Sequence, residues 1–351
     1  RCPPDQDSLM SYARQPLLSS FALFLMMALT ACGGGGGGGA GGTPAAIGSP
    51  PPAPTAPGAS AAAGTDPVPG GGLVCTQGEV TSTRSATFAL VNLTRFALGL
   101  PQLARLTALD GTAQAHAQYA VANEESGVTE SYGLPCFTGV DLAQRLAAAG
   151  VVSTDLPGLR QRSEIVVGFA ASANAEPQPL DYINDALNNL YGRTFLLDPR
   201  MQQVGLGFSA EPGGLRRTLV LDMALRADTP AANAEVWAVW PRDGATGLPT
   251  RMRPSNIKPL AAGLVEGYPV TLHAAAPVGV TRFVMSTASD GSAVETTVLT
   301  AANDGNLLLA ASEVALVPNA PLAAGTTYRV EFDGSVGMTP LHLAWSFTTA
   351  P

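Results

Sequence analysis

Residues 204–225, VGLGFSAEPGGLRRTLVLDMAL, predict the centre of a sheet. Val204–Phe208 and Thr218–Leu225 are rich in aliphatic, β-branched and aromatic residues, which favour extended backbone. Between them, Glu211-Pro212-Gly213-Gly214 supplies the residue types of a turn. We therefore expect two strands joined by this turn.

Helical segments and a further strand precede this pair. Apolar residues recur at helical spacing in three places, and a short helix is expected over Asp141–Ala149. The recurring positions are Ala86, Leu90, Leu93 and Ala97; Leu109, Ala113, Ala117 and Ala120; and Leu180, Ile183, Leu187 and Leu190. Glu164–Phe169 is strand-like. Helices interleaved with a small sheet predict the α+β class and a three-layer α–β–α sandwich over residues 73–229.

The chain changes character near Thr229-Pro230-Ala231, where helical periodicity ends. Short strand-like runs follow, with turn pairs such as Asp243-Gly244 and Asp290-Gly291 between several of them. The runs are Glu235–Trp240, Tyr268–Ala274, Arg282–Ser286, Glu295–Leu299, Thr326–Phe332 and Leu341–Thr348. Short strands with frequent turns predict an all-β sandwich over residues 230–351.

The first part of the chain resembles the start of a bacterial lipoprotein. Arg14 precedes an apolar run from Leu17 to Ala31, which is shorter than the roughly 20 residues of a membrane span. The run ends in Leu29-Thr30-Ala31-Cys32, which looks like a lipobox whose cysteine receives diacylglycerol. We expect residues 1–31 to be a signal peptide, with an upstream translation artefact before Met10. An ordinary secretory signal is the alternative.

Residues 32–72 are expected to form a disordered tether. Gly33–Gly72 consists almost entirely of Gly, Pro, Ala, Ser and Thr, so it cannot bury enough apolar surface to fold. A flexible segment of that length has a typical reach of roughly 35 Å. In Gram-negative lipoproteins an aspartate after the lipidated cysteine favours the inner membrane. Gly33 at this position therefore implies the outer membrane, by the same resemblance.

Charge and cysteine usage fit an exported protein. The formal net charge is −8 and no basic cluster is present, so nucleic acid is not expected as a partner. Cys2 lies in the discarded segment and Cys32 takes the lipid, which leaves Cys75 and Cys136 as a disulfide pair. Closing that loop would stabilise the fold by about 4 kcal/mol in the chain-entropy model. The alternative is two buried free thiols.

Several short motifs follow one another between Cys75 and Ala227. They are Val91-Asn92-Leu93-Thr94-Arg95 with Gly99-Leu100, Ala113–Tyr119, Phe137-Thr138-Gly139, Arg145–Gly150, Ser163-Glu164-Ile165, Tyr191-Gly192-Arg193 and Val204–Gly207. Their order resembles the CAP superfamily, the SCP-like extracellular proteins that include cysteine-rich secretory, antigen 5 and pathogenesis-related 1 proteins. Near the end of the chain, Pro318–Leu322 and Trp345–Thr349 are similar to bacterial Ig-like domains.

Metal-binding members of the CAP superfamily use two histidines and two acidic residues around a central cleft. Glu130 and Glu164 match the acidic positions, but the histidine positions carry Val128 or Thr129 and Gly192. The resemblance therefore implies a degenerate metal site. Neither a metal nor another cofactor is expected.

His116 is not expected to replace the lost histidines. It lies in helical phase with Leu109 and Ala113, near the packed side of its helix, so we expect a hydrogen-bonded histidine of the core or its boundary. The other two histidines, His273 and His342, belong to the expected β-sandwich.

Five residues are expected to line a cleft of the CAP-like portion: Glu130, Tyr132, Glu164, Tyr191 and Arg193. If Glu130 and Glu164 face each other, their repulsion would raise one pKa, which suits proton transfer. The alternative is that these acids bond backbone or side-chain groups and hold the strand and loop in place. The sequence shows no nucleophile paired with a base.

These features favour a secreted, lipid-anchored protein of the outer membrane that binds a ligand or contacts a surface without catalysis. The expected partners are the membrane, through the anchor, and an apolar small molecule or a cell-surface component. A weak peptide or cell-wall hydrolase that uses Glu130 and Glu164 is the alternative. A structural or adhesive spacer is the third hypothesis.

Because the imidazole positions are lost, the pure, folded protein should contain no stoichiometric zinc. Atomic absorption on extensively dialysed protein checks this expectation. Tight binding of one zinc ion per chain would contradict it.

Overall fold

The computed structural model describes residues 78–79, 81–125, 127–151, 161–170, 177–211, 216–225, 235–253, 257–260 and 265–351. The expected signal peptide, lipidated Cys32 and tether lie outside these residues. Contacts gather Pro69–Pro351 into one compact unit, and the expected domain boundary near Pro230 stays a prediction. Within the described ranges, no helix is both long and apolar enough to cross a membrane.

The first sheet is organised around the two strands that residues 204–225 predict. β4 (Gln203–Ala210) and β5 (Arg216–Leu225) pair antiparallel, and β3 (Gln161–Ala170) pairs antiparallel with the other edge of β5. β1 (Gly78–Glu79) and β2 (Ala104–Arg105) both pair with β4, antiparallel and parallel respectively. β4 and β5 are therefore the central strands of a five-stranded sheet.

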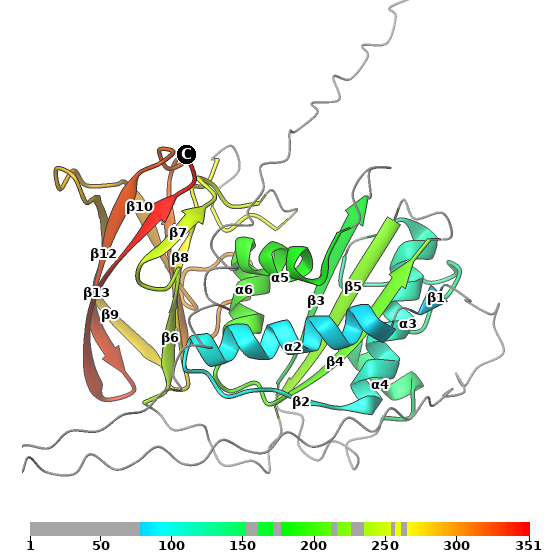
Figure 1. Ribbon diagram of the computed structural model, residues 1–351. Coiled ribbons are helices and arrows are strands. Elements are labelled where there is room, and N and C mark those ends of the chain that lie inside the picture. Colours follow the sequence, from blue (N-terminus) through cyan, green and yellow to red (C-terminus); the bar gives the residue numbers. More distant parts are fainter. Residues whose placement is uncertain are drawn as a thin grey trace, which may run out of the picture. The chain divides into compact units, whose positions relative to one another are not determined.

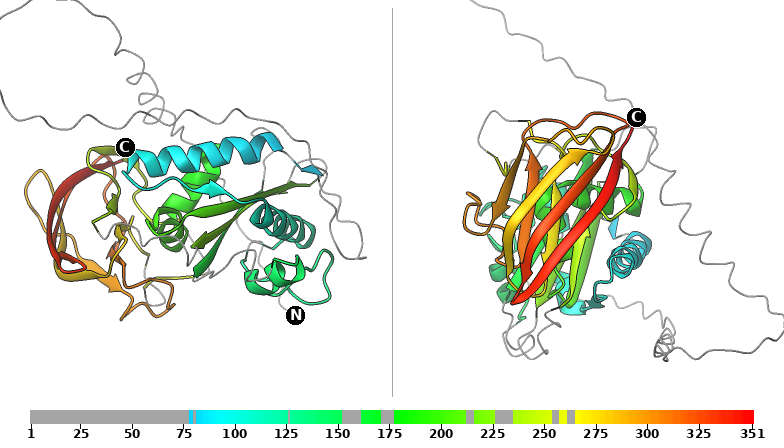
Figure 2. Two further views of the ribbon diagram at one scale, coloured as in Figure 1. Left: turned by 90° about the horizontal axis from the view of Figure 1, so that it is seen from below. Right: turned by 90° about the vertical axis from the view of Figure 1, so that its left-hand side faces the viewer.

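The described helices all lie in the N-terminal portion. They are α2 (Thr81–Ala97), α3 (Thr107–Asn123), α4 (Leu142–Ala148), α5 (Pro179–Asn188) and α6 (Leu190–Leu197). α2 and α3 lie on opposite sides of the strands (Figures 1 and 2). The single helix expected through Leu180 and Leu190 is divided at Asn189. The Asn189 side chain accepts hydrogen bonds from the Tyr191 and Gly192 amides and so starts α6.

Two glycines of β4 allow α3 to approach the sheet closely. A Cβ atom on Gly207 would lie 2.1 Å from the carbonyl group of Ala113, and Gly205 faces α3 in the same way. At this short separation the Gln114 side chain of α3 bonds both backbone groups of Phe208, at 3.0 Å each. Glycine is therefore required in β4 because the helix backbone occupies the space of a side chain.

The C-terminal portion consists of two four-stranded sheets, in the orders β10–β11–β8–β6 and β7–β13–β12–β9. Their strands are β6 (Trp237–Trp240), β7 (Ala245–Leu248), β8 (Val270–Ala274), β9 (Val278–Thr287), β10 (Thr296–Thr300), β11 (Glu313–Pro318), β12 (Thr327–Val336) and β13 (Thr339–Thr349). The right-hand view of Figure 2 shows the β7–β13–β12–β9 sheet from its outer side. Buried side chains of both sheets, among them Leu272, Leu316 and Phe332, form one core between them.

The β10–β11–β8–β6 sheet is also covered on its other face. Every residue of β8 and β11 is buried, although only alternate residues face the second sheet. On the opposite face, Ala315 and Val317 pack with Tyr191 of α6. Arg193 of α6 lies over the Tyr268 ring, 4.9 Å from its centroid. Helix α6 therefore contributes to the core of the C-terminal portion.

The expected three-layer α–β–α sandwich over residues 73–229 is wrong. Strand residues outnumber helical residues in the described chain, and its helices are confined to residues 81–197. A covering layer needs helices whose apolar faces all lie against one sheet. Helix α6 instead divides its apolar side chains: Leu196 joins the first core, whereas Leu190 joins the C-terminal strands.

Gly207→Ala should lower the free energy of unfolding by about 2–3 kcal/mol, because the new methyl group must push α3 away from β4. Urea unfolding followed by circular dichroism measures the effect. Gly111→Ala is the matched control, since that exposed glycine of α3 has no atom within 4 Å of its Cβ position. The control should raise stability by about 0.5–1 kcal/mol. Equal effects of the two substitutions would contradict the close approach.

Candidate functional site

A group of charged side chains is enclosed where α3, α4, β3, β5 and the loop between α3 and α4 meet. Its members are His116, Glu130, Arg145, Glu164 and Asp222, and we refer to them as the buried cluster. Their exposed fractions are 0%, 2%, 1%, 7% and 0%, respectively. Each member comes from a different element, so only the tertiary fold brings them together.

Glu130 is held in the charged form by donors on both of its oxygens. Oε2 accepts hydrogen bonds from the Thr138 amide at 2.6 Å and the Gly139 amide at 3.2 Å, and Oε1 accepts from the Thr138 hydroxyl at 3.0 Å. Burial by itself would raise the pKa of Glu130. The hydrogen bonds from His116 and the Thr138 amide outweigh burial and lower this pKa.

His116 lies between two hydrogen-bond acceptors. Nδ1 is 2.9 Å from Oε1 of Glu130, and Nε2 is 3.0 Å from the carbonyl oxygen of Gly127. Each ring nitrogen therefore faces an oxygen acceptor. The Tyr119 ring stacks parallel to it, with centroids 5.9 Å apart. The prediction of a buried, hydrogen-bonded histidine is confirmed.

Arg145 of α4 joins the strand to the loop. Its Nη2 atom donates to Oε2 of Glu164 at 2.5 Å and to the Val128 carbonyl oxygen at 3.2 Å. Its Nη1 atom donates to the Gly139 carbonyl oxygen at 3.3 Å. One guanidinium group therefore fixes the backbone of the loop at two points and neutralises a buried carboxylate.

Glu164 and Asp222 are directly opposite one another on β3 and β5. Oδ2 of Asp222 accepts a hydrogen bond from the Thr112 hydroxyl at 2.6 Å. Oε1 of Glu164 and Oδ1 of Asp222 have no hydrogen-bond partner among the described residues. Burial, together with the charge of Asp222, raises the pKa of Glu164 to about 9, and burial also raises the pKa of Asp222. One proton retained between the two carboxyl groups would satisfy both oxygens.

That proton also reduces the net charge of the buried cluster. Glu164 and Asp222 together carry one negative charge when they retain a single proton, and Arg145 supplies a positive charge beside Glu164. Pairing of these charges avoids the large free-energy cost of an unpaired charge in a low-dielectric interior.

The five residues expected in one cleft lie in three places. Glu130 and Glu164 both belong to the buried cluster, where Arg145 lies between them rather than an open cleft. The Tyr132 side chain is 88% exposed on the loop before α4. Tyr191 and Arg193 lie on α6 against the C-terminal strands. Their shared role in ligand binding stays a prediction.

Three members of this network were not predicted from the sequence. Arg145 pairs with Glu164, Asp222 lies opposite Glu164, and Thr112 bonds Asp222. A signal was present, because Asp222 interrupts the apolar run Leu219–Ala224 and Arg145 is the one charged residue of α4. An isolated charge in an apolar segment indicates a buried, paired side chain.

Among the described residues there is no group of three or more His, Cys, Asp or Glu side chains that could hold a metal ion. Arg145 lies between Glu130 and Glu164, where two acidic ligands would otherwise converge. Cys136 is disulfide-bonded, and Cys75, its expected partner, lies outside the described residues.

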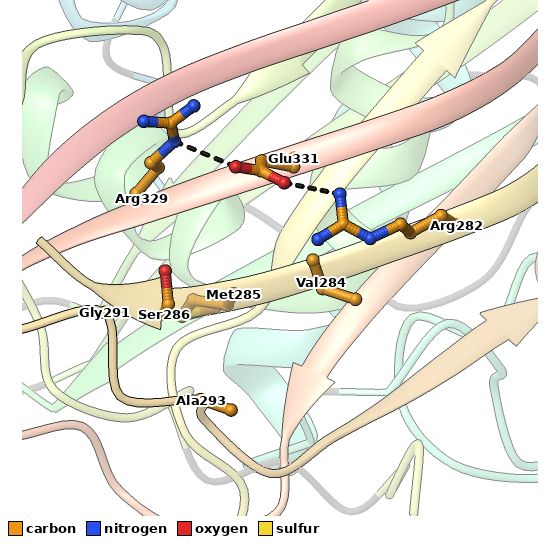
Figure 3. A pocket seen from close by; sticks show the side chains of 8 residues that line it. All are labelled: Arg282, Val284, Met285, Ser286, Gly291, Ala293, Arg329 and Glu331. Carbon is orange, nitrogen blue, oxygen red and sulfur yellow. Dashed lines mark hydrogen bonds and ion pairs between the residues drawn. The ribbon is translucent and has the colours of Figure 1, made fainter.

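A hollow of about 380 Å³ lies on the outer face of the β7–β13–β12–β9 sheet (Figure 3). Arg282, Arg329 and Glu331 dominate its wall. Both guanidinium groups bond the Glu331 carboxylate, Arg329 Nε at 3.0 Å, so the carboxylate occupies the position that an anionic ligand would take. The two arginine side chains are at least half exposed, and water screens their charge. Solvent-exposed ion pairs therefore line this hollow.

No protein-family model and no curated protein matches the chain. Two solved structures show similarity over less than half of it. One is an outer surface protein of Borrelia burgdorferi, with a TM-score of 0.34, 14% identity, and coverage of 43% of this chain and 98% of that protein. Another is an extracellular protein containing an SCP domain from Bacillus anthracis, with a TM-score of 0.33, 17% identity, and coverage of 41% of each chain.

The proton retained by Glu164 should make stability depend on pH. The pKa of this acid rises from 4.5 to about 9 on folding, so its stabilising contribution is complete below pH 4.5 and is lost as pH rises through 9. The free energy of unfolding should therefore fall between about pH 5 and about pH 9, and Glu164→Gln should reduce that slope. Burial raises the pKa of Glu313 to about 8, so the difference between the two proteins is the informative quantity. Parallel pH profiles in urea unfolding would contradict the retained proton.

Proposed function

We propose that this chain is an exported, lipid-tethered CAP-like module of the cell envelope that contacts a ligand or a cell-surface component without catalysing a reaction. The lipid anchor on Cys32, the outer-membrane location and the Ig-like character of the C-terminal portion are parts of this proposal. The enclosure of the acidic residues that would have to perform hydrolysis supports it most directly.

A hydrolase needs a carboxylate whose lone pair reaches a water molecule beside the substrate. Glu130 has both oxygens occupied by donors and is 2% exposed. Glu164 is 7% exposed and bonded to Arg145, and burial together with the charge of Asp222 raises its pKa to about 9. Neither acid is available as a general base, so these side chains are assigned a positioning role.

The buried cluster holds the loop between α3 and α4 in position. On the inner side of this loop, His116 and Arg145 bond the carbonyl oxygens of Gly127, Val128 and Gly139. The outer side of the same loop exposes Tyr132 at 88% and Val128 at 46%. A loop that is already held in one conformation loses little conformational entropy on binding, which favours recognition. A tyrosine side chain offers both apolar area and a hydroxyl group to a partner.

The first test of this proposal concerns catalysis. Purified protein should cleave neither casein nor peptidoglycan sacculi above the background of heat-denatured protein, and Glu164→Gln should leave that background unchanged. Glu125→Gln, a carboxylate outside the buried cluster, is the matched control. Cleavage that disappears in Glu164→Gln and persists in Glu125→Gln would establish the hydrolase instead.

The second test concerns the surface of the loop. Tyr132→Ala should reduce retention of the fluorescently labelled protein on intact cells at least about fivefold, because a central aromatic contact commonly dominates an interface. The thermal midpoint should fall only slightly, since this side chain is exposed and its ring contact is the edge-on packing against Phe137. Met338→Ala, at a position that is 99% exposed, controls for loss of an arbitrary surface side chain. Equal retention of both variants would remove the loop from the proposal.

A further inference from the structure

Exposed apolar side chains are concentrated on the loop between α3 and α4. Val128, Tyr132, Leu134 and Val140 are 46%, 88%, 39% and 39% exposed, respectively. Elsewhere along the described chain, exposed large hydrophobic side chains occur singly or in pairs. Single exposed apolar residues are ordinary, whereas a cluster of them marks a contact surface. We refer to these four residues as the apolar loop surface.

The loop is held so that these side chains cannot turn inward. A hydrogen bond of 2.9 Å from the Glu130 amide to the Val140 carbonyl oxygen closes the base of the loop. Nδ2 of Asn123 donates to the Pro135 carbonyl oxygen at 2.8 Å. Side chains of the buried cluster fill the inner side, where they bond the loop backbone. Rearrangement would leave these buried polar groups without partners, so the apolar loop surface stays outside unless another molecule covers it.

The charge around the loop restricts what can cover it. Within residues 127–140 the one charged residue is Glu130, which is 2% exposed, so the outer side of this segment carries no charge. Acidic side chains border it, because Glu124 precedes the loop, in an ion pair with Arg216 at 2.6 Å, and the exposed Asp141 follows it. An uncharged apolar surface with acidic neighbours fits an electrically neutral partner better than an anionic one.

A covalent bond ties the N-terminal segment of the chain to this loop. Cys136 of the loop is disulfide-bonded. The other cysteines of the chain, Cys2, Cys32 and Cys75, all precede β1, and Cys75 is the expected partner. The proposed function places a lipid on Cys32 of that same segment. The point where the tether joins the folded unit therefore coincides with the apolar loop surface, which brings this side of the molecule nearest to the bilayer.

We propose that the apolar loop surface docks on the boundary between headgroups and acyl chains of a zwitterionic phospholipid bilayer. This inference rests on the proposed lipid tether and names the partner of the loop. The Tyr132 ring packs edge-on against Phe137, with centroids 5.4 Å apart. A tyrosine is suited to this boundary, since its ring contacts acyl chains while its hydroxyl group reaches water. Four side chains bind a bilayer weakly, and the tether compensates by raising their effective concentration.

Vesicle sedimentation without the anchor measures the affinity of the loop. The mature chain, residues 32–351, carries Cys32→Ser so that no lipid is attached, and it retains the whole compact unit. It should bind phosphatidylcholine vesicles. Tyr132→Ser with Leu134→Ser should weaken binding at least about tenfold, because apolar area is lost from the contact.

Leu307→Ser with Met338→Ser is the matched control. These side chains are 83% and 99% exposed on other parts of the chain, and the pair removes a similar amount of apolar surface. Binding should stay within about twofold, because none of that surface belongs to the contact. Replacing about a third of the phosphatidylcholine by phosphatidylglycerol should weaken binding of the unaltered loop, because acidic side chains border it.

Tryptophan fluorescence of the lipidated chain tests the orientation. On vesicles of brominated phosphatidylcholine, the tryptophan introduced by Tyr132→Trp should be quenched at least about threefold more than the one introduced by Met338→Trp, because only the first reaches the acyl boundary. The native tryptophans contribute equally to both variants.

Three results would overturn the proposal. They are the absence of binding to phosphatidylcholine vesicles, equal losses in the two double variants, and equal quenching at positions 132 and 338. Retention on intact cells that needs Tyr132 without vesicle binding would assign the loop to a protein or glycan and leave the proposed function standing. Peptide cleavage that needs Glu164 would remove the proposed function and would not alter the vesicle results.

Discussion

The Arg145 guanidinium group lies where α4, the loop before it and β3 meet, and the N-terminal portion depends on its charge. Without it, Glu164 would lose the partner at 2.5 Å, and the carbonyl oxygens of Val128 and Gly139 would lose their donor. Removing one partner from a buried ion pair commonly costs about 3–5 kcal/mol, because the remaining charge has no solvent. The proton retained between Glu164 and Asp222 leaves one negative charge on the two acids, which Arg145 pairs. The result is a polar core that specifies one loop conformation.

Side chains of one helix pack into both portions of the compact unit and so join them. Helix α6 contributes to the first core through Leu196 and to the C-terminal strands through Leu190 and Tyr191. The Tyr191 hydroxyl donates to Asp304 at 2.7 Å, which adds a directional bond to the apolar contact. A surface presented by either portion is therefore held in a fixed relation to α6.

Sequence patterns predicted the positions of helices and strands better than they predicted which face of each element is buried. Ala86, Leu90, Leu93 and Ala97 predict a helix where α2 lies, yet Leu93 is exposed and Arg95 is buried. Periodicity measures regularity along one segment, whereas the buried face is chosen by partners elsewhere, here the carbonyl oxygens of residues 196–201. β11 (Glu313–Pro318) was not predicted, although its apolar run is typical of a strand that is covered on both faces.

The sequence by itself determined the β4–β5 pair, the positions of the helices and most strands, and the burial of His116, because local residue preferences and short-range periodicity decide these features. Only the tertiary structure decided that Glu130, Arg145, Glu164 and Asp222 share one enclosure, and that α6 serves two cores. Charges separated by tens of residues become partners only after the chain has brought them within a few ångströms. Whether an acid can act as a base depends on that final distance and on exclusion of water, neither of which a linear pattern contains.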